Sequence, residues 1–124
     1  MRLMKQRQFL FKAWRQKQQF MYDNVAIGVS GEIGYRVGKG KYEFEKLSSD
    51  VCILQYTGKK DKAGKKIFEG DTLKIDRQED ILTVSWDKSK LGFVLHFLKD
   101  KARKEVKCPP ISKIRIVGNI FEKK

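Results

Sequence analysis

The second half of the chain alternates apolar and polar residues with a period of two, in short segments separated by turn residues. Leu73 and Ile75 share one side of such a segment, and residues 81–87 and 92–98 repeat the pattern. A period of two places alternate side chains on opposite faces of a strand. Consecutive short strands joined by tight turns are typical of a small, strongly bent antiparallel barrel. The sequence therefore predicts an SH3-like barrel over residues 51–124.

The first half of the chain carries strand signals as well, although they are more scattered. Residues 7–15 ("RQFLFKAWR") are rich in aromatic residues, and five glycines lie among β-branched and aromatic residues between positions 28 and 40. Glycines at such spacing indicate short strands with turns or bulges. A length of 124 residues with 40% hydrophobic content suits one domain. We therefore expect a single mainly β domain over residues 1–124, with minor helix, in which a β-rich subdomain (1–50) packs on the barrel.

The net charge of +13 is concentrated at the two ends of the sequence. Residues 1–22 hold six basic and no acidic residues, and residues 99–124 hold nine basic and three acidic ones. If the ends share one face, they form a positive surface suited to nucleic acid or an acidic protein. The alternative is a solvated surface, since Lys outnumbers Arg and phosphate readers favour Arg. The candidate phosphate contacts are Arg2, Lys5, Arg7, Lys12, Arg15, Lys17, Lys101, Arg103 and Lys104.

Residues 55–71 ("QYTGKKDKAGKKIFEGD") combine glycines and lysines in a way that invites comparison with a phosphate-binding loop. A Walker loop has four residues between its glycines and a hydroxyl residue after its lysine. Here five residues separate Gly58 from Gly64, and Lys65 is followed by Lys66. The residues that follow predict a strand, so no helix N-terminus would face a phosphate. The segment therefore does not fit a nucleotide-binding loop.

The same segment fits a pair of turns. Asp61 is suited to open a type I turn by bonding its own backbone, and Gly64 is suited to close it in a left-handed conformation. Gly70 allows a second sharp change of direction before the next strand. We therefore assign a structural role to five residues of the segment: Gly58, Asp61, Gly64, Gly70 and Asp71.

The chain lacks the residue clusters that catalysis or metal binding requires. It contains one histidine, His96, and two cysteines, Cys52 and Cys108, which lie far apart in the sequence and belong to no CxxC pair. A four-ligand zinc site would have to recruit carboxylates from loops. We expect two buried, inert thiols, no cofactor, no metal and no enzymatic activity.

The distribution of apolar residues also bears on location. No run of about 18 uncharged apolar residues is present, so no membrane partner is expected. The basic N-terminal residues 1–19 lack the apolar core and the small-residue cleavage site of a signal peptide. We therefore expect a cytoplasmic protein.

Three segments resemble the YopX family, which comprises small proteins of phages and prophages. Residues 55–71 are similar to the family pattern Q-Y-T-G-x-K-D-x-x-G-K-x-I-[YF]-E-G-D. Residues 9–15 ("FLFKAWR") resemble the opening F-R-A-W-D, with Arg15 in place of Asp, and residues 117–122 ("VGNIFE") resemble the closing I-G-N-[IV]-[YF]-E. The resemblance implies a mostly β fold with an SH3-like barrel in the C-terminal half and a phage or prophage origin. It implies no established activity.

Two functions are compatible with these features. The first is a phage accessory protein that binds nucleic acid, or a nucleoprotein complex, through its basic surface. The second is an interaction module that binds or inhibits a host replication, transcription or defence protein, with a groove lined by Trp14, Tyr56 and Trp86. Self-association is a variant of the second, because an exposed N-terminal strand could pair with its copy.

Overall fold

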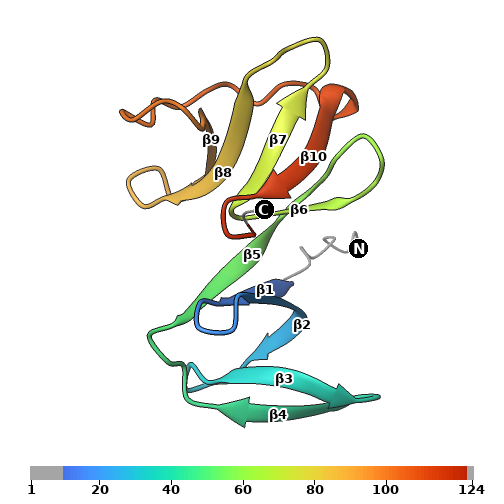
Figure 1. Ribbon diagram of the computed structural model, residues 1–124, viewed down its shortest axis with the longest axis vertical. Coiled ribbons are helices and arrows are strands. Elements are labelled where there is room, and N and C mark those ends of the chain that lie inside the picture. Colours follow the sequence, from blue (N-terminus) through green and yellow to red (C-terminus); the bar gives the residue numbers. More distant parts are fainter. Residues whose placement is uncertain (1–9, 123–124) are drawn as a thin grey trace, which may run out of the picture.

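The computed structural model describes residues 10–122 and consists of strands in two antiparallel sheets (Figure 1). One sheet has the strand order β4-β3-β2-β1-β5-β6, and the other has the order β10-β7-β8-β9. The mainly β fold expected from the sequence is confirmed, and helix among the described residues is limited to one 3-10 turn, Ile111–Lys113. The strands are β1 (Phe11–Arg15), β2 (Phe20–Ile27), β3 (Ile33–Gly38), β4 (Lys41–Glu45), β5 (Val51–Lys60), β6 (Lys66–Phe68), β7 (Asp71–Ile75), β8 (Ile81–Asp87), β9 (Gly92–Phe97) and β10 (Ile114–Asn119).

The predicted closed barrel is not found among the described strands. The C-terminal sheet ends at β10 on one side and at β9 on the other, while β5 and β6 belong to the first sheet. The reason lies in β5, which the sequence assigns to the barrel. The first half of β5 is instead paired with β1, with Phe11 opposite Gln55 and Arg15 opposite Val51. The C-terminal sheet is therefore an open sheet with edges at β10 and β9.

Strand β5 connects the two halves of the molecule. It begins beside β1 and continues upward in the view to pair with β6, where Tyr56 lies opposite Phe68 and Lys60 lies opposite Lys66 (Figure 1). It is the longest strand, with 10 residues. One continuous strand therefore contributes to both the N-terminal sheet and the hairpin that contacts the C-terminal sheet.

Each half has its own cluster of buried apolar side chains. The C-terminal cluster is centred on Leu73, Leu82 and Ile114, which are almost completely buried. The N-terminal cluster is smaller and is built on Ala13, Val25 and Ile33. Burial of these side chains supplies the main driving force for both sheets. The inward orientation predicted for Leu73 and Ile75 of β7 is confirmed, because both side chains belong to the C-terminal cluster.

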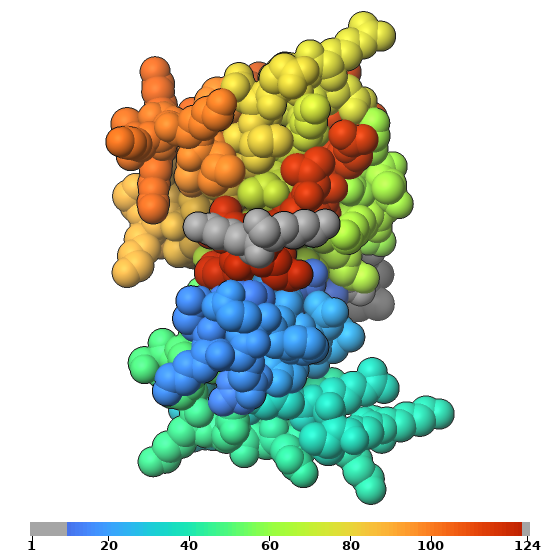
Figure 2. All heavy atoms as spheres, in the orientation of Figure 1, coloured from blue at the N-terminus to red at the C-terminus, as the bar shows by residue number. Residues whose placement is uncertain are grey.

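The C-terminal segment returns to the junction between the two halves. The Phe121 ring lies 6.2 Å from the Trp14 ring, measured between centroids. The Gly70 N–H donates to the Val84 carbonyl, and the Ile120 N–H donates to the Gly70 carbonyl, both at 2.9 Å. Figure 2 shows this segment, in red, between the upper half and the β1–β2 region. Gly70 has a φ of 87°, and a Cβ there would lie 2.8 Å from Phe121, so the position requires glycine.

Candidate nucleic-acid interface

The turn between β5 and β6 is organised by one carboxylate. The Asp61 Oδ1 atom accepts hydrogen bonds from the backbone N–H groups of Ala63 and Lys65, each at 2.9 Å. Gly64 takes a φ of 81°, the left-handed conformation that closes such a turn. The turn residues therefore adopt the roles that their chemistry favours.

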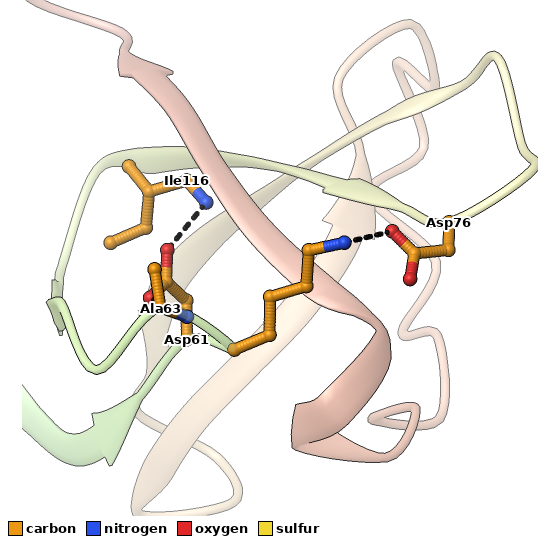
Figure 3. A network of polar contacts seen from close by, with 5 residues as sticks. Asp61, Ala63, Asp76 and Ile116 are labelled. Atoms are coloured by element: carbon orange, nitrogen blue, oxygen red, sulfur yellow. Dashed lines mark hydrogen bonds and ion pairs between the residues drawn. The ribbon is translucent and has the colours of Figure 1, made fainter.

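The other oxygen of Asp61 attaches this turn to a distant strand. The Ile116 N–H of β10 donates to Asp61 Oδ2 at 3.1 Å (Figure 3). The Lys62 N–H donates to the Ile114 carbonyl at 2.9 Å. Burial alone would raise the pKa of Asp61, but the backbone N–H donors of Ile116, Lys65 and Ala63 and the Lys65 charge outweigh it and hold that pKa below its ordinary value. Asp61 is thus a buried anion that joins the hairpin to the edge of the C-terminal sheet.

Docking of the turn brings three basic segments of the chain next to one another, because the Lys62 N–H donates to the Ile114 carbonyl and the Asp76 N–H donates to the Lys113 carbonyl. Residues 59–66, 74–77 and 113–115 contain nine basic residues and only two acidic ones, Asp61 and Asp76. Asp61 is buried, and Asp76 forms an ion pair with Lys62 at 2.8 Å (Figure 3). We use the term hairpin face for the surface of these three segments, whose basic residues are Lys59, Lys60, Lys62, Lys65, Lys66, Lys74, Arg77, Lys113 and Arg115.

Within the hairpin face, like charges are placed directly opposite each other on paired strands. Lys60 of β5 is the register partner of Lys66 of β6, and Lys74 of β7 is the register partner of Arg115 of β10. Within residues 10–122 none of these four side chains forms an ion pair with an acidic residue. Like charges in opposed positions destabilise a sheet. An anion bound over them would remove that repulsion.

The basic residues predicted near the N-terminus have a different setting. Lys12 lies 3.7 Å from an Asp23 carboxylate oxygen, and its Nζ is 4.5 Å from the centre of the Phe68 ring. Arg15 forms an ion pair with Glu45 at 3.1 Å. Both charges therefore have partners within the chain. Of the remaining predicted residues, Lys17 is exposed in the β1–β2 turn, while Arg2, Lys5 and Arg7 lie outside the described residues.

The basic residues predicted near the C-terminus lie in the exposed loop that follows β9. The Asp100 carboxylate accepts hydrogen bonds from the backbone N–H groups of Ala102 and Lys104, both at 3.0 Å, and shapes this loop. Arg103 has a φ of 52°, and Lys101 and Lys104 are exposed beside it. The loop belongs to the β9 side of the C-terminal sheet, whereas Lys12 and Arg15 belong to β1 of the other sheet (Figure 1).

The three aromatic residues predicted to line a partner groove do not meet at the surface. Trp14 and Tyr56 are each only 4% exposed. They are buried because Phe121 packs near Trp14 and Phe68 packs near Tyr56. Trp86 is 44% exposed. The groove assignment is therefore corrected for Trp14 and Tyr56, which belong to the junction between the two halves.

Trp86 lies instead on an apolar cleft of about 720 Å³ between β5 and β9. Core residues such as Leu73 and Leu95 form part of its lining, and Leu91 and Val106 line it as well. Leu91 is 80% exposed. The cleft lies between β5 and the C-terminal sheet, so its lining comes from segments that are far apart in the sequence. A local sequence pattern therefore does not predict it.

Asp71 is a second buried carboxylate, and its pKa is shifted in the opposite direction to that of Asp61. It is 7% exposed and accepts one hydrogen bond, from the Phe68 N–H to Oδ2 at 2.8 Å. Burial raises the pKa of Asp71 from 3.8 to about 6, against the Phe68 hydrogen bond and the charges of Lys12 and Lys65, which lower it. A single N–H donor does not compensate this carboxylate for the loss of water.

The residues considered for metal chemistry are dispersed. Cys52 is partly buried, but Cys108 is exposed, so the expectation of two buried thiols is wrong for Cys108. Its place in the loop after Val106 leaves it outside the core. Across residues 10–122 no group of three His, Cys, Asp or Glu side chains is placed to hold a metal ion. In the same part of the chain, no helix has the length and apolar character needed to span a bilayer.

Comparisons with known proteins extend over nearly the whole chain. The family model described as YopX protein matches residues 10–124. No curated protein sequence matches the chain. Protein EF1440 from Enterococcus faecalis has a similar structure, with a TM-score of 0.63 and 25% identity over 94% of this chain and 96% of that one. Protein yopX from Bacillus subtilis has a TM-score of 0.58 and 14% identity over 92% of this chain and 94% of that one, which shows a shared fold.

Proposed function

We propose that this chain, which belongs to the YopX family, is a phage or prophage accessory protein that binds nucleic acid in the bacterial cytoplasm. The hairpin face is the proposed contact surface. The observation that carries the proposal is the alignment of Lys60 with Lys66 and of Lys74 with Arg115. Opposed like charges destabilise the sheet and are not needed for solubility. Phosphates bound over these side chains would neutralise the repulsion between them, and the nucleic acid would release counterions.

The proposed binding is to the phosphate backbone and carries little sequence preference. Lysine presents a point charge and not a rigid fork, and seven of the nine basic residues of the hairpin face are lysines. Contacts to phosphates set position and affinity but do not distinguish bases. The aromatic side chains nearest the hairpin, Tyr56 and Phe68, are buried and therefore do not offer stacking platforms for bases.

A salt titration of nucleic-acid binding tests this function. The Lys60→Gln/Lys66→Gln variant should bind duplex DNA at least about tenfold more weakly than the unmodified protein at low salt, and its plot of log affinity against log salt should be shallower by about 2. Fluorescence anisotropy with labelled duplex, single-stranded DNA and RNA measures both quantities. The Lys74→Gln/Arg115→Gln variant should behave in the same way.

The matched control removes the same charge elsewhere. Lys39→Gln/Lys46→Gln changes two exposed lysines of the N-terminal half and should leave the affinity nearly unchanged. A further variant, Lys101→Gln/Arg103→Gln/Lys104→Gln, measures the contribution of the loop after β9. Equal losses in the hairpin and control variants would show that net charge alone drives binding. The absence of binding to all three nucleic acids at low salt would contradict the proposed function.

We further propose that the C-terminal sheet and the hairpin are an opened form of an SH3-like barrel. The hairpin turn is attached to the β10 edge through Asp61 and Lys62, which supports one seam of such a barrel. The cleft lies between β9 and β5, where the second seam would close. At this open seam Trp86 and Leu91 are exposed beside buried core side chains.

A second candidate function follows from that open seam. Trp86 and Leu91 are exposed beside an apolar cleft, the kind of feature that captures an apolar segment of another protein. The candidate partner is a host replication, transcription or defence protein. A nuclease-treated pull-down from host lysate should recover one partner in stoichiometric amount, and Trp86→Ala/Leu91→Ala should abolish its recovery while Lys88→Ala does not. Recovery that Trp86→Ala/Leu91→Ala leaves intact would exclude the cleft as the contact.

A further inference from the structure

Strand β4 is an edge strand of the N-terminal sheet. It is the last strand in the order, paired with β3 on one side only, and lies at the bottom of the view in Figure 1. All five of its residues, Lys41–Glu45, are exposed, and the aromatic side chains of Tyr42 and Phe44 are 40% and 53% exposed. An edge strand offers a row of backbone donors and acceptors to a further strand. This edge therefore has both the backbone and the apolar side chains needed to accept one.

Strand β4 carries charges of both signs along one face. Lys41, Glu43 and Glu45 share this face, while Tyr42 and Phe44 share the other. Glu45 is already paired with Arg15, at 3.1 Å. Within residues 10–122, neither Lys41 nor Glu43 forms an ion pair. One positive and one negative charge thus remain unneutralised on the edge.

These charges select one way for the strand to pair with its own copy. In an antiparallel pair centred on Glu43, Lys41 would face the partner's Glu45, which is already paired with Arg15, and Glu43 would face the partner's Glu43. In a pair centred on Phe44, Glu43 would face the partner's Glu45. In a pair centred on Tyr42, Lys41 faces the partner's Glu43, and by symmetry Glu43 faces the partner's Lys41. Opposite charges in register stabilise a strand pair and like charges destabilise it, so the third register is favoured.

We propose that two copies of this chain associate through β4, antiparallel and centred on Tyr42. A two-fold axis then passes through the Tyr42 pair, as an isologous interface requires. Phe44 then lies beyond the last opposed pair, beside the partner's β3–β4 turn, in which Gly40 has a φ of 70°. The interface joins the two N-terminal sheets into one and covers the exposed aromatic side chains. It leaves the hairpin face of each copy free.

The charges also explain why the partner is a second copy. Charged residues on an edge strand ordinarily prevent association, because an incoming strand rarely carries the matching signs. In the order Lys-Tyr-Glu, the charges on the two sides of the central residue are opposite. An identical strand that runs antiparallel therefore places Lys opposite Glu at both positions. An unrelated strand would have to present both signs at the same spacing.

A charge-swap experiment tests the interface with the full chain and no nucleic acid. Sedimentation velocity or light scattering over a concentration series should show a species of twice the monomer mass. Lys41→Glu opposes two acidic residues, and Glu43→Lys opposes two basic ones, so each variant alone should weaken dimerisation at least about tenfold. The control variant Lys88→Glu makes the same charge change in the turn after β8 and should dimerise normally.

Two combinations then distinguish a specific register from a general charge effect. The double variant Lys41→Glu/Glu43→Lys should dimerise again, because each opposed pair regains opposite signs. An equimolar mixture of the two single variants should form a mixed dimer, since positions 41 and 43 are then both acidic in one chain and both basic in the other. A monomer at every accessible concentration would overturn the proposal. So would a dimer that both single variants leave unchanged, or a double variant that stays monomeric.

Discussion

Replacement of Asp61 by alanine is expected to lower the free energy of unfolding by about 3 kcal/mol, because the carboxylate accepts three backbone hydrogen bonds. Two of the donors, Ala63 and Lys65, lie in the exposed turn, where water replaces part of the loss. The third, Ile116, is a strand residue that loses its attachment to the hairpin. Urea denaturation followed by tryptophan fluorescence measures the change.

Asp76→Ala is the matched control for this prediction. Asp76 lies beside the same hairpin and forms an ion pair with Lys62, but both side chains are exposed (Figure 3). Exposed ion pairs contribute little to stability, so this variant should unfold at nearly the denaturant concentration of the unmodified protein. Asp61→Asn should have an intermediate effect, because its amide oxygen can still accept from Ala63 and Lys65 while its NH2 group cannot accept from Ile116. Equal effects of Asp61→Ala and Asp76→Ala would contradict the role given to Asp61.

Replacement of Asp71 by asparagine is expected to raise the free energy of unfolding at pH 7 by about 2 to 3 kcal/mol. Burial raises the pKa of Asp71 from 3.8 to about 6, and each tenfold change in proton affinity corresponds to about 1.4 kcal/mol between the two protonation states. Asparagine is neutral at all pH values and keeps an oxygen to accept the Phe68 N–H. The variant therefore loses the cost of burying a charge and keeps the hydrogen bond.

The pH dependence of this effect has a defined sign. Between about pH 4 and pH 6 the folded protein binds the Asp71 proton more tightly than the unfolded chain does, so the stability contributed by this group falls as pH rises through that window. The advantage of Asp71→Asn should thus be small at pH 4 and complete above pH 7. Asp76→Asn is the control, since its carboxyl is exposed and its pKa is lowered, chiefly by the hydrogen bond from Lys62. A gain that does not change with pH would rule out titration of Asp71 as the cause.

Features that depend on neighbouring residues were predictable from the sequence. The turns at Asp61–Gly64 and at Gly70 follow from the conformational preferences of Asp and Gly, and the structure shows positive φ angles at both glycines. The inward alternation of Leu73 and Ile75 follows from the period of a strand. The family resemblance rests on the same local segments and is confirmed by a match over residues 10–124.

Features that depend on distant contacts were not predictable. Asp61 meets Ile116 across 55 positions of the sequence, and nothing near Asp61 indicates that partner. Aromatic residues at Trp14 and Tyr56 suit an exposed groove and a buried junction equally well, and the packing of Phe121 and Phe68 decides between them. The opposition of Lys74 and Arg115 depends on the register of two strands that are far apart in sequence. Charge totals therefore pointed to the chain ends, while the structure gathers basic residues around the hairpin.

The continuity of β5 determines how the protein loses its structure. Residues Val51–Gln55 hold β1 in place, and the next residues of the same strand lead into the hairpin that Asp61 fastens to β10. Unfolding of either half removes one of the strands that pair with β5, β1 or β6, and so destabilises β5 in the other half as well. Partial unfolding is therefore costly, and the two halves should melt together as one cooperative unit despite their separate cores.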